Sequence, residues 1–313
     1  MIDIQSENFI ADFKMSDATV GTIGYGFIGK AVVELFKPHC NVLAYDKART
    51  DLNTLDDVVA KSELIFVAVP TPMQKTGECF TGIVESVFQD IQNSAVKTGR
   101  DLGAFVAVLK STVPPGFTKK MQDRYAIRIV FSPEFLTEAN AVNDFITTNR
   151  ILLGGDIEDA RIVYKYFEGV WPDRQYNTWS DHPDGPVAII QCDSTEAEMV
   201  KLSTNVHLTA RVMISNELYL ICQKLGVDYD TVKVLTQIDK RIGMSHMNVP
   251  GPDGHCGIGG HCFWKDLNNL RFVSEEKLQL GKSLFSSLAE RNLEIRDDRN
   301  WESQPDRAVV KDV

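Results

Sequence analysis

The sequence lacks several features that would place it in particular classes of protein. Its six cysteines are sparse and irregularly spaced, which excludes the dense disulfide framework of a small secreted domain. No apolar run approaches the roughly 20 residues that a membrane-spanning helix needs. The chain opens without a basic segment followed by an apolar run, so no signal peptide is predicted. We therefore expect a soluble, cytoplasmic protein with reduced thiols.

Net positive charge is also absent. The 33 lysines and arginines are outnumbered by 43 aspartates and glutamates, which leaves a net charge of -10. Proteins that bind nucleic acids usually present a basic field, so this balance argues against that class. With 313 residues, of which 43% are hydrophobic, the chain is long and apolar enough to form two domains with buried cores.

Apolar runs alternate with helical stretches in the first part of the chain. The runs predict buried strands at residues 18–23, 41–45, 64–69, 105–109, 127–131 and 151–153. Such alternation predicts an α/β fold with a Rossmann-like, doubly wound and mostly parallel sheet over residues 18–191. Residues 1–17 are polar and aperiodic, and they predict an irregular leader.

Helical patterning dominates the second part of the chain. Ser194-Thr195 followed by Glu198 predicts a capping box at the beginning of a long helix. We expect helices over residues 195–224 and 229–239, then a glycine-rich loop at 250–260, after which helical patterning resumes over residues 265–294. The pattern therefore predicts an all-helical central domain over residues 192–296, followed by a charged tail, residues 297–313, that frays.

A glycine-rich turn marks the candidate cofactor site. Gly24-Tyr-Gly-Phe-Ile-Gly29 lies between a predicted strand and a predicted helix. Its glycines permit a tight turn and a close approach of the backbone to a pyrophosphate, which the positive end of the helix dipole also favours. Asp46 follows about 20 residues on, where a carboxylate accepts hydrogen bonds from a ribose 2′-hydroxyl and repels a 2′-phosphate. A glycine turn without a ligand is the alternative. The context favours an NAD site formed by Gly24, Gly26, Phe27, Ile28, Gly29 and Asp46.

Three predicted strands end in short motifs that contain proline. The motifs are Val69-Pro-Thr-Pro72, Lys110-Ser-Thr-Val-Pro-Pro115 and Ser132-Pro-Glu-Phe-Leu136. Prolines that simply end strands are one interpretation. However, ligands of open α/β sheets bind outside the carboxyl ends of the strands, so three such motifs favour a shared site. Thr112 is a candidate hydrogen-bonding group there, and Glu134 and Glu138 are candidate acid-base groups.

A lysine and an asparagine share one face of the long predicted helix. Lys201 and Asn205 are four residues apart. A solvated surface is the usual place for a lysine, but the neighbouring Val200, Leu202 and Val206 favour burial. A buried lysine near a reacting carbonyl can donate a hydrogen bond to a developing oxyanion.

One cysteine stands out as a candidate nucleophile. Cys262 lies in Gly257-Ile-Gly-Gly-His-Cys-Phe-Trp-Lys-Asp266. Consecutive glycines let backbone amides approach one centre and favour a thiolate, and Asp266 can act as a base from the same helical face. An inert buried cysteine is one alternative. A zinc site formed by His255-Cys256 and His261-Cys262 is another, but this spacing strains tetrahedral geometry, so we expect no metal.

Taken in order, these motifs resemble the nucleotide-sugar dehydrogenases of the UDP-glucose and GDP-mannose 6-dehydrogenase type. The similarity runs from about residue 19 to residue 295. It rests on the glycine fingerprint, the three proline-containing segments, Lys201 with Asn205, Asp239-Lys-Arg-Ile-Gly243 and the cysteine motif. Agreement of several motifs in one order is more specific than any one of them.

The resemblance implies a function and a set of roles. It implies oxidation of the C6 alcohol of a nucleotide sugar to a uronic acid with two NAD per substrate, in polysaccharide biosynthesis. Cys262 would form a thiohemiacetal and then a thioester. Catalytic roles would fall to Cys262, Lys201, Asn205, Asp266, Thr112 and Glu138, substrate contacts to Glu134, Phe135, Leu136, Arg241 and Gly259, and further cofactor contacts to Val69, Pro70, Thr71, Ser111 and Thr112. The family forms dimers through its long central helix, so a homodimer is implied.

The sequence departs from the family's pattern at several points. The family carries a third, C-terminal α/β domain that helps to bind the nucleotide, and this chain ends near where that domain would begin. His261 stands where a small residue is usual, and Trp264 stands where proline is usual. An aspartate expected after the Val-Pro-Thr-Pro segment is replaced near Phe80.

Two other functions are compatible with parts of the sequence. A two-electron β-hydroxyacid dehydrogenase is similar in its fingerprint and its lysine–asparagine pair, but it needs no cysteine. A truncated, non-catalytic NAD-binding protein would need none of the catalytic groups. The presence of Cys262, Lys201, Asn205 and Asp266 in one chain argues against this last function.

Overall fold

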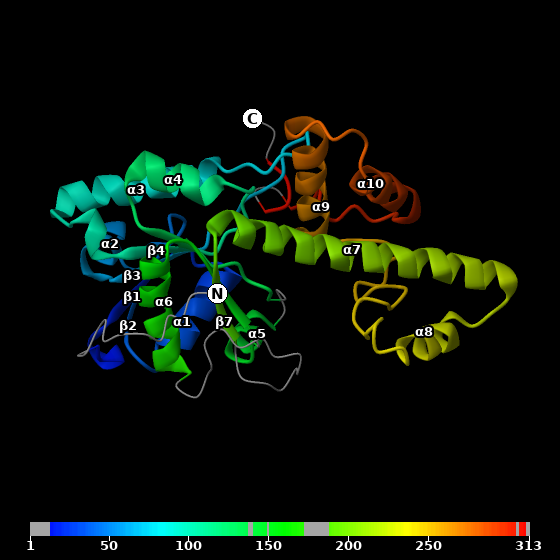
Figure 1. The fold of residues 1–313 in the computed structure, drawn as a ribbon, viewed down its shortest axis with the longest axis horizontal. Helices are drawn as coiled ribbons and strands as arrows, with labels where there is room; N and C mark the ends of the chain where they lie inside the picture. Colours follow the sequence, from blue (N-terminus) through cyan, green and yellow to red (C-terminus); the bar gives the residue numbers. More distant parts are fainter. Residues whose placement is uncertain (1–12, 137–139, 149, 172–187, 305–306, 311–313) are drawn as a thin grey trace. The chain divides into compact units, whose positions relative to one another are not determined.

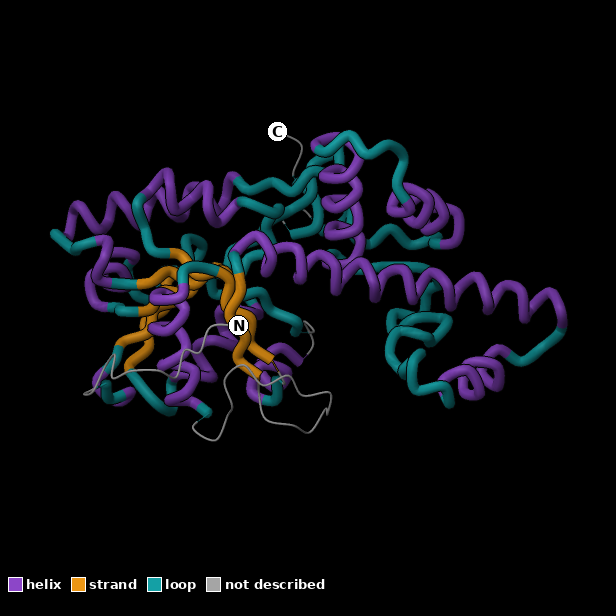
Figure 2. The backbone as a smooth tube through the Cα atoms, viewed as in Figure 1, coloured by secondary structure: helices purple, strands orange, loops and turns teal. Residues whose placement is uncertain are grey.

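The computed structural model describes residues 13–136, 140–148, 150–171, 188–304 and 307–310. The chain divides into two compact units: unit 1 contains residues 1–70 and 81–201, and unit 2 contains residues 71–80 and 202–313. Among the described residues, the strands of the sheet belong to unit 1, whereas unit 2 is built from helices and loops (Figure 2). No helix in the described ranges is long and apolar enough to cross a membrane.

Unit 1 is built around a seven-stranded sheet in the order β2-β1-β3-β4-β5-β6-β7. The strands are β1 (Thr19–Ile23), β2 (Asn41–Tyr45), β3 (Leu64–Val67), β4 (Val106–Leu109), β5 (Ile129–Phe131), β6 (Arg150–Gly154) and β7 (Ala188–Cys192). Neighbouring strands are parallel except β5 and β6, which pair antiparallel at Phe131 and Gly154. The predicted Rossmann-like, mostly parallel sheet is therefore confirmed, and the apolar pattern misses only β7 among these strands.

Helices cover both faces of this sheet. One face carries α1 (Phe27–Phe36), α5 (Ala141–Ile146) and α6 (Ile157–Val170), and the other carries α2 (Leu55–Lys61), α3 (Gly82–Thr98) and α4 (Phe117–Tyr125), as Figure 1 shows. Alternate residues of β3 point to opposite faces, so Phe66 packs in the first layer and Ile65 in the second. A short 3-10 turn, η2 (Leu102–Ala104), precedes β4.

The register of the central strands brings three motifs to one edge of the sheet. Ile23 pairs with Val67, and Val67 pairs with Leu109. Because the three strands are parallel and in register, the residues that follow them, Gly24, Ala68 and Lys110, leave the sheet at the same edge. This is the carboxyl edge, at which α/β proteins of this kind bind their ligands.

The prediction of an irregular leader is wrong for residues 13–17. Met15–Asp17 form a 3-10 turn, η1. The Phe13 ring lies 5.0 Å from that of Tyr166, and Met15 packs against the core of the first helical layer. Apolar contacts that are distant in sequence order this segment, so its local polarity was a poor guide.

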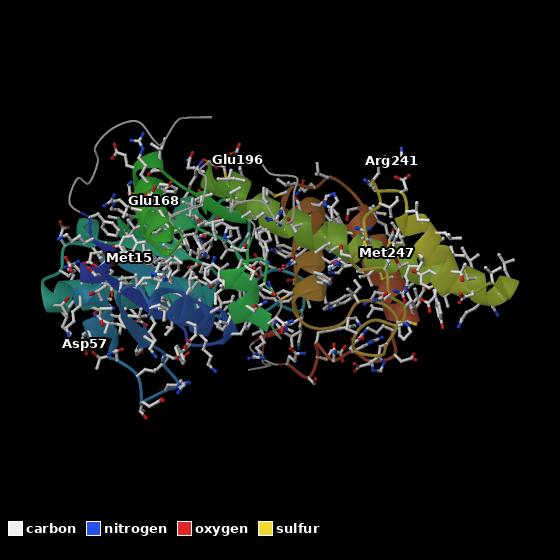
Figure 3. All side chains as sticks on the ribbon, turned by 90° about the horizontal axis from the view of Figure 1, so that it is seen from below. Met15, Asp57, Glu168, Glu196, Arg241 and Met247 are labelled. Atoms are coloured by element: carbon white, nitrogen blue, oxygen red, sulfur yellow. The ribbon has the colours of Figure 1, made fainter. Side chains whose placement is uncertain are left out.

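A single long helix, α7 (Ser194–Leu225), runs from unit 1 into unit 2. The helix is confirmed, but the predicted capping box is displaced. Its first residue is Asp193 rather than Ser194, and its glutamate is Glu196 rather than Glu198. The Asp193 carboxylate accepts from the Thr195 amide, and Glu196, labelled in Figure 3, accepts from the Asp193 amide. Glu198 instead is buried and accepts hydrogen bonds from Gly116 and Thr118, which fixes the beginning of α4.

The remaining helices belong to unit 2. They are α8 (Tyr229–Gln237), α9 (Cys262–Phe272) and α10 (Leu284–Ile295), with a π-helical turn, η4 (Val273–Lys277), directly after α9. The helical patterning expected over residues 265–294 is therefore divided among α9, η4 and α10. The Glu275 carboxylate accepts from the Ser283 amide and from two serine hydroxyls, which fixes the connection between η4 and α10.

The prediction that the chain frays after Ile295 is wrong for residues 296–304 and 307–310. Trp301 is buried and packs in the core of unit 2. Val309 forms a β-bridge with Met73. The segment is mostly charged, so its sequence pattern did not indicate that a few apolar side chains fix it.

Candidate active site

The glycine turn of unit 1 has the geometry of a phosphate-binding loop. Gly24 has a φ of 94°, and a side chain there would overlap the Ala68 carbonyl. A side chain at Gly29 would overlap the Gly24 carbonyl, so packing requires both glycines. At Gly26, by contrast, an added Cβ would meet no protein atom within 4 Å. This exposed space at the beginning of α1, beside Phe27 and Ile28, fits a pyrophosphate.

Asp46 lies at the end of β2, next to the glycine turn. Its carboxylate accepts from the Tyr25 amide at 2.7 Å and from the Ala48 amide at 2.9 Å. These two bonds hold the carboxylate beside the turn and leave lone pairs on both oxygens for a ribose hydroxyl. The residues present therefore fit the adenosine part of NAD.

The ends of β3 and β4 are joined by a serine. The Ser111 hydroxyl accepts from the Val69 amide at 3.0 Å and donates to the Val69 carbonyl at 2.7 Å. Ser111 thus fixes the backbone that leads to Pro70. Thr112 follows as a half-buried side chain. Thr71 is buried in unit 2, where its carbonyl accepts a weak hydrogen bond from the Cys79 thiol at 4.0 Å.

Lys201 and Glu134 come together in unit 1. The Lys201 ammonium donates to the Glu134 carbonyl at 2.6 Å and lies 3.5 Å from a carboxylate oxygen of the same residue. The other carboxylate oxygen accepts from the Leu136 amide at 2.6 Å. Lys201 is 4% exposed, so it is buried rather than part of a solvated face. Glu138 lies outside the described residues.

A second lysine, Lys110, supports the same segment. It is buried, and its ammonium donates to the Pro133 carbonyl at 3.3 Å. Burial lowers the pKa of Lys110 to about 8 against the attraction of Glu134. Phe135 lies under two cations, the Lys201 ammonium at 5.4 Å and the Arg150 guanidinium at 4.0 Å from the ring centroid.

Cys262 begins helix α9 in unit 2. A helix N-terminus favours negative charge, which suits a thiolate. One turn on, the Asp266 carboxylate pairs with the Lys265 ammonium at 2.6 Å and accepts from the Asn205 side-chain amide at 2.6 Å. All three side chains are buried, with Asp266 only 1% exposed. The structure thus brings Asn205 and Asp266 together, while Lys201 belongs to the other compact unit.

Lys265 is a site residue that the sequence reasoning missed. Burial opposes its charge, but Asp266 and the sulfurs of Cys79 and Cys262 raise the pKa of Lys265 above its usual range. Cys79 is itself buried, and burial raises the pKa of its thiol. Lys265 precedes Asp266 and lies one helical turn after Cys262, so the spacing was the available signal.

The glycine loop before Cys262 does not present the open cradle of amides that its sequence suggested. The amides of Gly257, Ile258 and Gly260 donate to the side chains of Asn216, Asn292 and Asn300, at 2.8, 2.7 and 2.9 Å. These amides are therefore used to fix the loop. Beside them, Gly259 packs so closely on the Arg296 guanidinium that a side chain there would collide with it.

Arg241 lies on the loop that follows α8 (Figure 3). Its side chain is 88% exposed and is held by Asp239 at 2.5 Å. Within the described ranges, no group of three or more histidine, cysteine, aspartate or glutamate side chains gathers to hold a metal ion. His255 and Cys256 lie in the loop before the cysteine helix, where His255 is 3.8 Å from Asp298.

Comparison with known proteins gives two domain matches. Residues 41–168 match the NAD binding domain of the UDP-glucose/GDP-mannose dehydrogenase family, and residues 195–293 match the central domain of the same family. A UDP-glucose 6-dehydrogenase, TuaD of Bacillus subtilis, is 29% identical over 78% of this chain and 47% of its own length. A second one from that organism, YwqF, is 30% identical over 72% of this chain and 48% of its own length. The chain thus spans about half the length of these curated relatives.

Solved structures agree with these matches. A UDP-glucose dehydrogenase from Pyrobaculum islandicum superposes with a TM-score of 0.72 at 25% identity, covering 90% of this chain and 68% of that chain. A 3-hydroxyisobutyrate dehydrogenase from Mycobacterium tuberculosis shares the fold, with a TM-score of 0.63 at 15% identity over 89% of this chain and 93% of that chain. The two matched domains, the fold and the ordered motifs agree, and the chain therefore belongs to the UDP-glucose/GDP-mannose dehydrogenase family.

Proposed function

We propose that this protein oxidises the C6 alcohol of a nucleotide sugar such as UDP-glucose to the uronic acid, through a thioester on Cys262. The observation that carries the proposal is the group around that cysteine. Cys262 begins a helix, and the buried ion pair of Lys265 and Asp266 follows within about one helical turn. Asn205 donates a hydrogen bond to the Asp266 carboxylate of this pair. A nucleophile beside a buried base is the arrangement that covalent catalysis needs.

The cofactor in this proposal is NAD. Gly24, Gly26 and Gly29 would bind its pyrophosphate, and Asp46 would accept from the adenosine ribose. When bound, NAD supplies a hydride acceptor for each of two oxidations. The Asp46 carboxylate, fixed by two backbone amides, would repel the additional phosphate of NADP.

The first oxidation removes two electrons and two protons from the alcohol and gives an aldehyde. The Cys262 thiolate then adds to the aldehyde carbon, and the new oxyanion takes a proton to give a thiohemiacetal. A second oxidation, which removes two more electrons and two protons, gives the thioester. Water adds to its carbonyl carbon, the carbon–sulfur bond breaks, and the uronic acid leaves with the thiolate restored.

The surrounding groups would stabilise charge and move protons in these steps. Lys201 and Asn205 would donate hydrogen bonds to the oxyanions, and Asp266 would take a proton from the attacking water. Thr112 and Glu138 would position that water, and Glu134, Phe135, Leu136 and Gly259 would contact the sugar. Lys265 holds the Asp266 carboxylate in place through their ion pair. Arg241 would bind the substrate, and in a dimer it would reach the substrate of the neighbouring subunit.

The proposal is tested by trapping the thioester. Enzyme mixed with NAD and UDP-glucose is quenched in acid, and the peptide with Cys262 is weighed by mass spectrometry. We expect a uronyl adduct on that cysteine, accumulating further in Asp266→Asn because hydrolysis is slowed. Turnover without any adduct would favour the two-electron chemistry of a β-hydroxyacid dehydrogenase, a class that shares the fold.

We further propose that two copies associate through α7 and α8. Ile214, Leu218, Ile221 and Leu225 follow one face of α7, and they are 36–72% exposed. Their spacing of four, three and four residues is that of a helix seam. Val234, Leu235 and Ile238 of α8 are also exposed.

The association is tested by changing one residue of that face. Ile221→Glu should give a monomer in light scattering, because a charge would be desolvated at the seam. Val96→Glu is the matched control, since Val96 is an exposed apolar residue of α3. A wild-type protein that is monomeric at all concentrations would contradict the proposal.

A further inference from the structure

The segment of residues 296–304 and 307–310, here called the return segment, packs against the cysteine helix within unit 2. Trp301 is 2% exposed and shares a core with Trp264 and Leu267 of α9. Further along, the Met73 amide donates to the Ala308 carbonyl at 2.8 Å, and the Val310 amide donates to the Met73 carbonyl at 2.9 Å. The return segment is thus fixed by a buried aromatic side chain and by backbone hydrogen bonds.

Two consecutive residues of the return segment hold the chain on both sides of Cys262. The Asn300 side-chain oxygen accepts from the Gly260 amide, two residues before the cysteine, at 2.9 Å. The Trp301 ring stacks on Trp264, two residues after the cysteine, with centroids 4.6 Å apart and an interplanar angle of 24°. Because anchors lie on either side of Cys262, they restrain the backbone at that residue from both directions.

Arg296 also contacts the glycine loop that precedes Cys262. Its side chain is fully buried, and it donates to the Asp253 carboxylate at 2.6 Å and to the Cys256 carbonyl at 3.3 Å. The guanidinium fills the space beside Gly259, which leaves that residue no room for a side chain. Partners on several sides satisfy this buried charge, as a stable site of this kind requires.

Trp264 supplies the ring for this anchor from within the cysteine motif itself. The resemblance predicts proline at this position, and proline has no aromatic ring to stack on Trp301. Aromatic pairs of this kind contribute stabilisation beyond that of the area they bury. The tryptophan in the motif and the tryptophan in the return segment therefore form a matched pair.

We propose that Asn300 and Trp301 are positioning residues, which fix the Cys262 sulfur with respect to Lys265 and Asp266. The inference rests on the proposed function, in which Cys262 is the nucleophile. Neither residue reacts; each acts through the backbone of the cysteine motif. A misplacement of about 1 Å at a reacting centre can cost about 10²-fold in rate, so small losses of support have large effects.

The test compares Trp301→Ala, Trp301→Phe and Asn300→Ala with the wild type. The first readout needs no substrate: the rate at which iodoacetamide alkylates Cys262, followed by mass spectrometry across a pH series. The second readout is kcat and KM with NAD and UDP-glucose. The matched control is Trp171→Ala, because Trp171 is a buried tryptophan of unit 1 that stacks on Phe167 at 5.8 Å.

We expect Trp301→Ala and Asn300→Ala to shift the pH profile of Cys262 alkylation and to lower kcat by about 10- to 10²-fold, with KM for the sugar nearly unchanged. Trp301→Phe keeps an aromatic ring and should restore most of both quantities. Trp171→Ala should keep the wild-type alkylation profile. If Trp301→Ala does not fold, Asn300→Ala carries the test, since it removes a single hydrogen bond.

Wild-type alkylation profiles and kcat in both alanine variants would overturn the inference while leaving the proposed function intact. The reverse is also distinguishable. A wild type that oxidises no nucleotide sugar, but whose Cys262 profile shifts in Trp301→Ala and Asn300→Ala, would refute the function and support the positioning role.

Discussion

Lys265→Met removes one partner of a buried ion pair of unit 2. The ammonium and the Asp266 carboxylate are 2.6 Å apart, and their side chains are 7% and 1% exposed. Methionine fills a similar volume, so the variant leaves the carboxylate buried, with the Asn205 side-chain amide as its remaining hydrogen-bond donor among the described residues. Stranding one charge of a buried pair typically costs about 3–5 kcal/mol. We expect the free energy of unfolding to fall by about that amount, measured by urea unfolding with tryptophan fluorescence.

The pH dependence and two controls make this prediction specific. The pKa of Lys265 is raised in the folded protein, so its contribution is complete below the ordinary lysine pKa of about 10.4 and is lost only as pH rises through the folded value. The loss should therefore be equal at pH values near neutrality. Lys282→Met, which breaks an exposed pair with Glu290, should cost about 1 kcal/mol or less. Lys265→Met with Asp266→Leu should cost less than Lys265→Met alone, because no charge is stranded. A loss below about 1 kcal/mol in Lys265→Met would refute the reasoning.

Three further predictions concern the cysteine, the cofactor and a buried lysine. Cys262→Ala should form no uronic acid and release at most one NADH per sugar. The control Cys192→Ala, which changes a half-buried cysteine, should behave as wild type. Uronic acid from Cys262→Ala at the wild-type rate would exclude the thioester. Asp46→Ala should reduce the preference for NAD over NADP by about 10-fold, the worth of a hydrogen bond to a charged group, and an unchanged ratio of kcat/KM values would contradict the role. Burial lowers the pKa of Lys110 to about 8, so its ammonium destabilises the fold below that pH and ceases to do so as pH rises toward about 10.4. Lys110→Met should therefore raise the thermal midpoint most below pH 8, and a gain that is equal at all pH values would show that burial of the charge is not the cause.

The parts of the fold that follow from local sequence were predictable. Leu64–Val67 is apolar at every position and ends before a proline motif, which is the pattern of a strand buried on both faces. The glycine fingerprint was equally readable, because two of its glycines are required by the backbone itself. The long helix α7 was readable too, but its capping residues were not, because Glu198 is occupied by partners about 80 residues away.

The parts that depend on contacts distant in sequence were not predictable. Nothing in the local pattern shows that β6 pairs antiparallel with β5, or that Asn300 and Trp301 fold back on the cysteine motif. The glycines before Cys262 suggested free amides, whereas three asparagine side chains occupy the amides of that loop. The residue types of the site were thus readable, and their partners required the structure.

The most direct test of the proposed function is the number of NADH molecules formed per molecule of sugar consumed. Purified protein is incubated with excess NAD and a panel of UDP- and GDP-sugars, and NADH absorbance is compared with sugar loss by chromatography. We predict two NADH per sugar and the corresponding uronic acid for one member of the panel. One NADH per sugar, with aldehyde or ketone as the product, would contradict the thioester route, and NAD binding without turnover of any sugar would contradict the proposed activity.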